Sequence, residues 1–210
     1  MIKLADFLIL KTSPPKYTKK DIDVGNIPYE LYVICSIIRE SFCISYSIRK
    51  DINLYFYFKN PPYIIKFEGK KLRYLGPDER SQAILLLKAL NKGLKTTNNN
   101  WERSTPGIYI KNHNGVSAIA DLITETLKDE IVFLLHENDI EGTKVLEQLI
   151  NLKDSLYIIP SPDFSYDIIT FQEMFFNSNI KLTFLYLPRI KSVERQILYI
   201  NFIIDQQQNL

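Results

Sequence analysis

Strand-like and helix-like segments alternate along most of this 210-residue chain, and this alternation limits the possible folds more than any other feature. Short runs of β-branched and aromatic residues predict strands, whereas apolar residues at helical spacing predict helices. Such an alternation favours an α/β domain whose largely parallel central sheet is flanked by helices. The length suits a single domain spanning residues 1–210, and an apolar fraction of 46% supplies its core.

The order of the expected elements follows from the same patterns. The expected strands are residues 3–11, 52–58, 63–67, 131–135, 156–159 and 180–187, and Ser104 to Gly107 is expected as a turn that leads into a further strand. The expected helices are residues 29–46, 78–95, 116–127, 143–152, 167–176 and 192–205. Pro77 is expected at the first helical position of the 78–95 helix, where its missing N–H costs nothing.

Targeting and membrane segments are not expected. The first ten residues hold a short apolar stretch broken by Asp6, without the small-residue cleavage site of a signal peptide. No run of 18 uncharged apolar residues occurs. Cys35 and Cys43 fall eight residues apart in one expected helix, or about 12 Å, which is beyond the reach of a disulfide. We therefore expect two buried thiols in a reducing compartment, the cytoplasm.

The charge is divided unevenly between the two halves of the chain. Residues 1–111 hold 19 Lys and Arg against 10 Asp and Glu, whereas residues 112–210 hold 7 against 14. A basic half suggests a surface that meets a polyanion, although lysine runs can also serve only to keep a surface solvated. Charge therefore suggests a nucleic-acid partner without establishing one.

Several common catalytic signatures are missing. The sequence contains no GxGxxG after a strand, no GxxxxGK[ST] and no GxSxG. With only His113 and His136 and no CxxC, it offers no cluster at metal-ligand spacing, and no metal site is expected. These observations alone reach no further than an α/β protein with one basic half.

Three segments carry a family resemblance when they are taken together and in order. They are Ile48 to Ile52, Leu75 to Ser81, and Trp101 to Ile110, with Pro61-Pro62 and Lys66 to Gly69 between them. Their spacing resembles that of the archaeal TrmY-type tRNA pseudouridine-54 N1-methyltransferases. That family belongs to the SPOUT class, whose α/β fold has a C-terminal trefoil knot that binds S-adenosylmethionine. The resemblance implies the same fold, a tRNA substrate and a homodimer.

The resemblance also suggests roles for the residues of these segments. Asp78, Asp51 and Arg80 are the catalytic candidates, since a carboxylate could accept the proton that leaves the N1 nitrogen. The remaining charged and hydroxyl groups are candidates for binding RNA, because cations bind phosphates and hydroxyls reach the ribose or base: Arg49, Lys50, Glu79, Arg103, Ser104 and Thr105. Each segment also has a structural interpretation as a helix cap, a solvated helix end or a turn.

The methyl donor is expected in loops that follow the last strands of the chain. The residues that the resemblance assigns to it are Leu134, Leu135, Pro160, Leu182, Thr183, Leu185, Leu187 and Ser192. The sequence departs from the family here, since Pro160 stands where a glycine is expected and all seven glycines lie at or before Gly142. A non-catalytic RNA-binding relative, or an interaction protein without RNA affinity, are the alternative functions.

Overall fold

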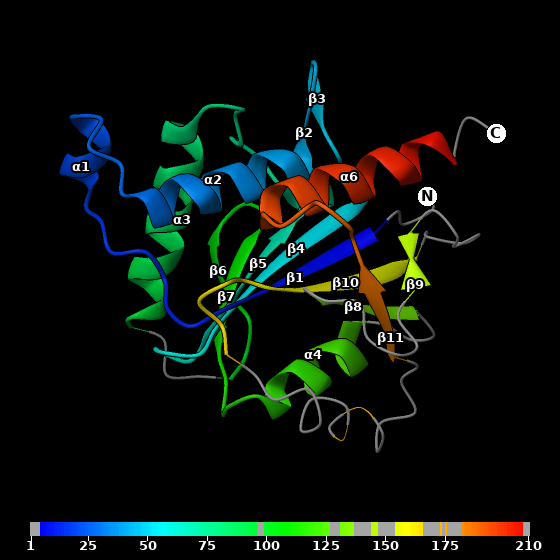
Figure 1. Cartoon of the computed structure of the whole chain (residues 1–210). Coiled ribbons are helices and arrows are strands. Elements are labelled where there is room, and N and C mark those ends of the chain that lie inside the picture. Colours follow the sequence, from blue (N-terminus) through cyan, green and yellow to red (C-terminus); the bar gives the residue numbers. More distant parts are fainter. Residues whose placement is uncertain are drawn as a thin grey trace.

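The computed structural model describes residues 5–95, 99–126, 131–136, 144–146, 154–165, 173, 175 and 182–207. Nine strands of these residues form one sheet in the order β6-β7-β5-β4-β1-β10-β8-β11-β9 (Figure 1). A second, two-stranded hairpin consists of β2 (Cys43–Ile44) and β3 (Ser47–Ile48). The expected α/β class with a mostly parallel sheet is confirmed.

The sheet has a parallel part and an antiparallel part. The parallel part contains β4 (Ile52–Phe58), β1 (Ala5–Lys11), β10 (Ser155–Pro160), β8 (Ile131–His136), β11 (Leu182–Tyr186) and β9 (Lys144–Val145). The antiparallel part extends it with β5 (Tyr63–Glu68), β7 (Ile108–Asn112) and β6 (Glu102–Thr105). In the strand order, β1 lies in the middle of the sheet, and its neighbours β4 and β10 are both parallel to it.

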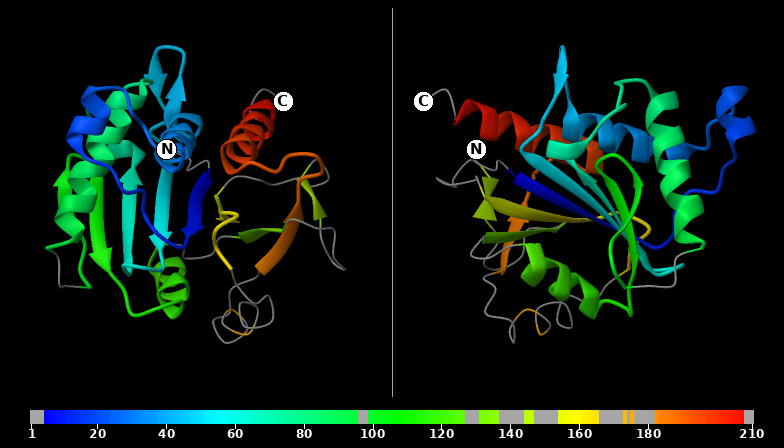
Figure 2. Two further views of the ribbon diagram at one scale, coloured as in Figure 1. Left: turned by 60° about the vertical axis from the view of Figure 1, so that its left-hand side comes forward. Right: turned by 180° about the vertical axis from the view of Figure 1, so that it is seen from behind.

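Helices cover both faces of the sheet. The upper face in Figure 1 carries α2 (Tyr29–Phe42), α3 (Glu79–Gly93) and α6 (Val193–Gln206), and the lower face carries α4 (Ser117–Thr126) (Figures 1 and 2). Two short elements complete the described chain: α1 (Lys19–Asp23), which contacts α3, and the 3-10 turn η1 (Gly69–Lys71). Among the described helices, none combines the length and the apolarity needed to cross a bilayer.

Two apolar clusters, one on each face, form the core. Phe7 and Ile9 of β1 join the cluster under α2, α3 and α6, whereas Leu8 and Leu10 join the one facing α4. This alternation follows from the two-residue period of a strand. Every residue of β1 is buried, as is typical of a central strand in a sheet covered on both faces.

The structure corrects several expected boundaries. The helix expected over 29–46 ends at Phe42, because Cys43 is extended and the chain turns into the β2–β3 hairpin. The turn expected at Ser104 to Gly107 is present at Pro106 and Gly107, where it joins β6 to β7 in a hairpin. Asp78 caps α3 rather than lying inside it, so Pro77 precedes the cap.

The expected helix over 143–152 is also wrong where it can be examined. Lys144 and Val145 form β9, which pairs with Leu185 and Tyr186 of β11. The rest of that range, except for residue 146, lies outside the described residues, as does most of the helix expected over 167–176.

Candidate functional site

The parallel strands give the sheet two edges, an amino edge where the strands begin and a carboxyl edge where they end, and the two edges carry different residues. Ile52, Ala5 and Ser155 are in register and begin their strands, so they mark the amino edge of the sheet. Phe58 and Pro160 end their strands at the opposite, carboxyl edge. A seven-residue strand places these edges about 20 Å apart.

The three sequence segments lie at the amino edge, where Leu75 and Pro77 of the second segment line a groove with residues of the first. Two glycines bring the backbones of the first and third segments against the η1 turn between them. A Cβ on Gly69 would lie 2.4 Å from the carbonyl oxygen of Ile52 and 2.7 Å from that of Arg49. Gly107 has φ +82°, and a Cβ there would lie 2.4 Å from the backbone nitrogen of Leu72. Only glycine fits both positions without displacing backbone. The chain around η1 is thus clamped between the first and third segments.

Hydrogen bonds complete this contact. The Glu68 N–H donates to the Gly107 carbonyl at 2.8 Å, and the Lys50 ammonium donates to the Leu72 carbonyl at 3.2 Å. Lys50 is otherwise exposed, and Asp51 beside it is half-buried. Cations and a carboxylate are therefore held together at the start of β4.

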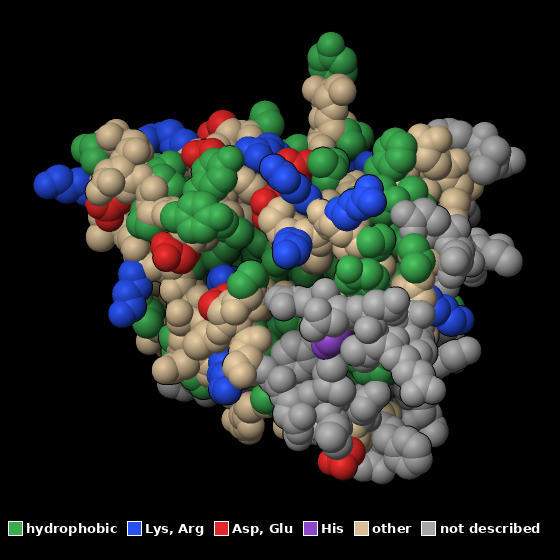
Figure 3. Space-filling model, in the orientation of Figure 1, with side chains coloured by type: hydrophobic (Ala, Val, Ile, Leu, Met, Phe, Trp, Pro, Cys, Tyr) green, Lys and Arg blue, Asp and Glu red, His purple; other side chains and the backbone are tan. Residues whose placement is uncertain are grey.

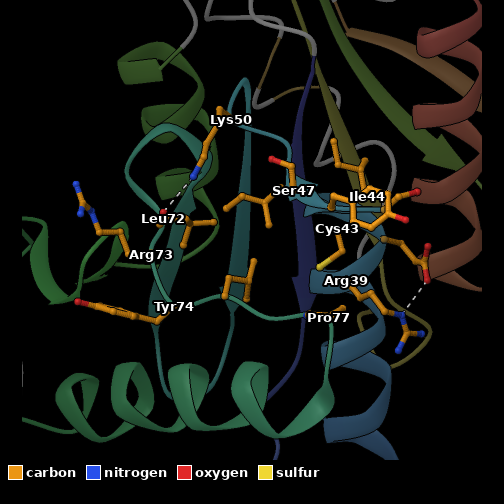
Figure 4. A pocket seen from close by; sticks show the side chains of 14 residues that line it. Arg39, Cys43, Ile44, Ser47, Lys50, Leu72, Arg73, Tyr74 and Pro77 are labelled. Carbon is orange, nitrogen blue, oxygen red and sulfur yellow. Dashed lines mark hydrogen bonds and ion pairs between the residues drawn. The ribbon is translucent and has the colours of Figure 1, made fainter.

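A groove of about 790 Å³ opens between this cluster and the β2–β3 hairpin. Figure 4 shows Cys43, Ile44 and Ser47 on one side, Lys50 and Leu72 on the other, and Arg73 and Tyr74 projecting away from the hairpin. The hairpin itself projects from the surface and carries the fully exposed Tyr46 (Figure 3). The sequence pattern did not predict this groove, because the helix expected over 29–46 includes the first strand and the turn of the hairpin.

Several of the predicted residues also have structural partners. The Arg49 guanidinium donates to the Asp205 carboxylate of α6 at 2.8 Å, and exposed Arg80 pairs with Asp23 at 2.7 Å. The Asp78 carboxylate accepts from the Ser81 N–H at 2.8 Å and so caps α3. Glu79 is half-buried in the first turn of that helix.

The third segment contributes exposed charge and one unsatisfied hydroxyl. Arg103 is exposed, and Ser104 and Thr105 are half-buried. The Thr105 Oγ1 atom is buried and has no hydrogen-bond partner among the described residues. Buried hydroxyls are normally paired, so an unpaired one next to the clamped turn is a candidate ligand contact.

The carboxyl edge holds a separate cavity of about 300 Å³. It lies where β8 and β11 end, beside the loop after β10 and the start of α6. Its lining residues are His136, Pro162, Tyr186, Leu187, Arg189, Ile190, Lys191 and Gln196. Ligands of parallel α/β sheets bind in crevices outside the carboxyl ends of the strands, and this cavity occupies such a position.

A buried lysine ties the neighbouring loops together. The Lys11 ammonium donates to the Asp163 carboxylate at 2.8 Å and to the Ser161 hydroxyl at 3.0 Å. The Thr12 N–H donates to the same carboxylate at 3.0 Å. Burial alone would raise the pKa of Asp163, but the hydrogen bonds and the charge of Lys11 outweigh burial and lower it. This cluster fixes the loop after β10 to the end of β1.

The predicted cofactor residues are distributed unevenly around this cavity. Leu187 lines it, and Ser192 lines an adjoining cavity of about 420 Å³ that also contacts Lys11 and Asp163. Pro160 ends β10 and is half-buried. The other five predicted residues lie within strands, in the core or toward the amino end of β11: Leu134, Leu135, Leu182, Thr183 and Leu185. Their assignment stays a prediction.

The residues of the cavity fit S-adenosylmethionine by their chemistry. Leu187 and Ile190 supply apolar wall for an adenine ring, and Arg189 and Lys191 supply cations for a carboxylate. The sequence analysis named the loops but missed His136, Arg189 and Lys191 as side chains. Among the described residues, no group of His, Cys, Asp and Glu is arranged to hold a metal ion.

Comparison with known proteins agrees with the geometry. A family model described as "Putative SAM-dependent RNA methyltransferase" matches residues 5–163. Proteins named tRNA (pseudouridine(54)-N(1))-methyltransferase are similar to the chain in three archaea. The Methanocaldococcus jannaschii protein is 31% identical over 67% of this chain and 73% of its own length. The Methanococcus vannielii protein is 34% identical over 58% of this chain and 61% of its own length. The Methanosarcina acetivorans protein is 31% identical over 68% and 65%.

The alignments with the last two proteins thus span less than two thirds of those proteins. The family model, in contrast, covers the whole amino-edge cluster, from β1 to the loop after β10. With that extent of the match, the chain belongs to the family of SAM-dependent RNA methyltransferases that the model describes.

Proposed function

We propose that this protein transfers a methyl group from S-adenosylmethionine to N1 of pseudouridine 54 in the T-loop of tRNA. The observation that carries the proposal is the meeting of three family-like segments at one edge of the sheet, in a chain of the RNA methyltransferase family. Similar proteins carry the name of this activity.

The amino edge supplies the groups that would bind the RNA. Lys50 and Arg103 are exposed cations that suit phosphates, and Ser104 and the unsatisfied Thr105 hydroxyl suit the ribose or base. The groove beside the hairpin is large enough for a nucleotide that has left its stack. Arg49 and Arg80 would support this surface through their ion pairs with Asp205 and Asp23, and Glu79 through its place in the first turn of α3.

Proton transfer from N1 is the chemical task of the protein itself. A carbon–nitrogen bond forms at N1, the bond between methyl and sulfur breaks, and the N1 proton must be accepted. Asp51 is the better placed acceptor, because the Asp78 carboxylate already caps α3. Bound S-adenosylmethionine supplies the electrophilic methyl group.

The cavity at the carboxyl edge would hold the donor. Arg189 and Lys191 would bind its carboxylate, and Leu187 and Ile190 would pack against its apolar parts. Backbone groups near Leu134, Leu135, Pro160, Leu182, Thr183, Leu185 and Ser192 complete the set of proposed contacts.

The separation of the two edges supports a homodimer. The amino-edge groove and the carboxyl-edge cavity of one chain lie at opposite ends of strands about 20 Å long, which is too far for direct methyl transfer. A second copy would bring its own cavity to the groove. This separation supports a dimeric active site with residues of both chains.

A C-terminal trefoil knot is part of the same proposal. Pro162 lines both carboxyl-edge cavities, together with residues of the 187–194 segment. The segment that leads into α6 therefore runs alongside the loop after β10, as threading through that loop would require. A cytoplasmic location belongs to the same proposal, and its support is that Cys35 is a buried free thiol and Cys43 a half-buried one.

Methyl incorporation into two matched tRNAs tests the proposal. One transcript carries pseudouridine at position 54 and the other carries uridine, whose N1 is bonded to ribose and has no proton to lose. We expect methyl transfer only to the pseudouridine transcript, and a calorimetric signal when S-adenosylmethionine is added to the protein. Equal labelling of both transcripts, or no heat at protein concentrations well above micromolar, would exclude this function.

A further inference from the structure

The antiparallel part of the sheet has an uncommon pattern of side chains on the face that carries α4. Lys66 of β5 lies directly opposite Tyr109 of β7, which lies directly opposite Arg103 of β6. Neighbouring strands are about 4.8 Å apart, so these three residues form a row of about 10 Å across the sheet. A cation therefore stands on each side of an aromatic ring.

The row faces away from the main core. Ile65 and Ile108, next to Lys66 and Tyr109 in sequence, belong to the cluster under α2 and α3. Alternation along the strands turns Lys66 and Tyr109 to the opposite face. Tyr109 is only half-buried and Arg103 is exposed, so the row is accessible.

Further rings and cations extend the row in both directions. The Lys66 ammonium lies 5.9 Å from the Tyr55 ring centroid and 6.0 Å from that of Trp101. Lys111 lies 4.6 Å from the Trp101 ring centroid. We use the name RNA-facing row for the members that reach the surface, which are Lys66, Lys71, Trp101, Arg103 and Tyr109, whereas Tyr55 and Lys111 are buried neighbours of the row.

The carboxylates in this region leave a positive balance. Glu125 of α4 accepts from Lys111 at 2.7 Å and from the Trp101 indole at 3.0 Å. Glu68 pairs with Lys71 at 3.0 Å and with Lys66 at 3.4 Å. Arg103 makes no ion pair with any described residue. Lys111 is buried and neutralised by Glu125, so the accessible surface keeps three cations, Lys66, Lys71 and Arg103, against Glu68, and this balance suits an anionic partner.

The row is also continuous with the amino edge. Lys71 belongs to η1, which Gly69 and Gly107 clamp beside the groove, and its ammonium lies 5.7 Å from the Tyr109 ring centroid. A chain bound in the groove could therefore pass directly onto the row. Cation–ring contacts by themselves would only stabilise the sheet, but they do not account for the unpaired Arg103.

We infer that the RNA-facing row binds unpaired nucleotides adjoining the target, with a base stacked on Tyr109 and phosphates held by Lys66, Lys71 and Arg103. Aromatic rings on antiparallel strands can stack bases, and flanking cations follow the backbone. The inference rests on the proposed function for the class of partner. It adds a binding surface outside the reaction centre and predicts a preference for single-stranded over paired RNA.

Trp101 makes the test direct, because it is the only tryptophan of the 210 residues. A seven-nucleotide unpaired RNA with a T-loop sequence is titrated while Trp101 fluorescence and RNA anisotropy are recorded. We expect the RNA to quench Trp101 and to bind more tightly than a base-paired stem of equal length. Arg103→Ala and Tyr109→Leu should each weaken binding about tenfold, whereas Tyr109→Phe should keep it.

A matched variant controls for charge alone. Arg195 is exposed on α6, on the other face of the sheet, and Arg195→Ala should leave the affinity unchanged. Arg103→Ala should also reduce the salt dependence of binding by about one phosphate contact. Equal affinity for the wild type, Arg103→Ala and Tyr109→Leu overturns the inference, as does equally tight binding of a poly-glutamate peptide.

The outcome is separable from that of the proposed function. If the wild type transfers methyl groups but the variants do not change its affinity for RNA, only the inference about the RNA-facing row is wrong. If the protein binds RNA tightly, the variants weaken that binding and no methyl group is transferred, only the proposed methyl transfer is wrong.

Discussion

The two edges of the sheet are held together by different means. At the amino edge, Gly69 and Gly107 let backbone touch backbone, with Cβ positions 2.4 Å from neighbouring main-chain atoms. At the carboxyl edge, side chains fix the loops, with the Lys11 ammonium bound to Asp163 and Ser161. Backbone contact tolerates no added atom, whereas a side-chain cluster can be rebuilt from other residues.

This difference explains where a family resemblance can be seen. The amino edge depends on glycines and turns at fixed spacing, so its segments remain recognisable in sequence. The carboxyl-edge cavity is lined by side chains from the ends of different strands, and part of its lining lies beyond residue 163, where the family match ends. A binding pocket can thus be retained while its sequence pattern changes.

Replacing Gly107 should destabilise the protein most, because it disrupts the backbone contact at the amino edge. Gly107→Ala introduces a Cβ at φ +82° against the backbone of Leu72. We expect it to lower the free energy of unfolding by roughly 3–4 kcal/mol, because left-handed strain and overpacking add. Chemical denaturation measures this change.

Gly25 provides the control. It also has a positive φ, +74°, but nothing lies within 4 Å of its Cβ position. Gly25→Ala should therefore cost only about 1 kcal/mol of backbone strain. Equal losses in the two variants would show that close approach does not hold the amino edge together.

The sequence predicted the fold well because its signals are local. Alternating strands and helices indicated the parallel sheet, and β1, β4 and β5 were placed within two residues of their bounds. The hairpin at Cys43 to Ile48 could not be foreseen, since apolar residues at helical spacing continue to Phe42 and no glycine marks the end. The pairing of Lys144 with Leu185 depends on a distant strand, which no local pattern reveals.

The site was predictable only in part for the same reason. The three segments were recognised from their order, but their contact depends on which turns approach one another. The predicted cofactor residues include strand residues such as Leu134 and Leu185, and this assignment stays a prediction, whereas the cavity at this edge is lined by the last residues of β8 and β11 and by loop residues beyond the strands. His136 and Lys191 could have been named from the rule that ligands bind at the carboxyl ends of parallel strands.

The two carboxylates of the amino edge, Asp51 and Asp78, are expected to have different roles. Asp51→Asn should lower the rate of methyl transfer by about 100-fold, since it removes the proposed proton acceptor. Asp78→Asn should leave the rate close to that of the wild type, because asparagine caps a helix as well as aspartate does. Single-turnover rates on pseudouridine tRNA measure both effects.

A third variant distinguishes the cap from the chemistry. Asp78→Ala removes the acceptor for the Ser81 N–H and should cost about 1 kcal/mol of stability without a comparable loss of rate. A 100-fold slower Asp78→Asn enzyme with normal stability would instead identify Asp78 as the proton acceptor.

The smallest effect concerns the carboxyl edge and its dependence on pH. His113 is buried against Tyr57, with Nε2 2.9 Å from the Phe58 carbonyl and Nδ1 accepting from the Gly115 N–H at 3.0 Å. Burial lowers the pKa of His113 below its usual 6.5, with a smaller contribution from Lys111, and this outweighs the hydrogen bond to the Phe58 carbonyl, which favours the protonated ring.

The sign of the effect follows from linkage. Below pH 6.5 the unfolded chain binds a proton that the folded state resists, so stability is complete above this pH and falls as the pH drops through the folded pKa. Protonation also removes the Gly115 hydrogen bond, worth on the order of 1 kcal/mol. We expect the free energy of unfolding to decline between about pH 7 and pH 5, and His113→Gln to reduce that slope. The same slope in wild type and His113→Gln would mean that this edge is insensitive to the charge of His113.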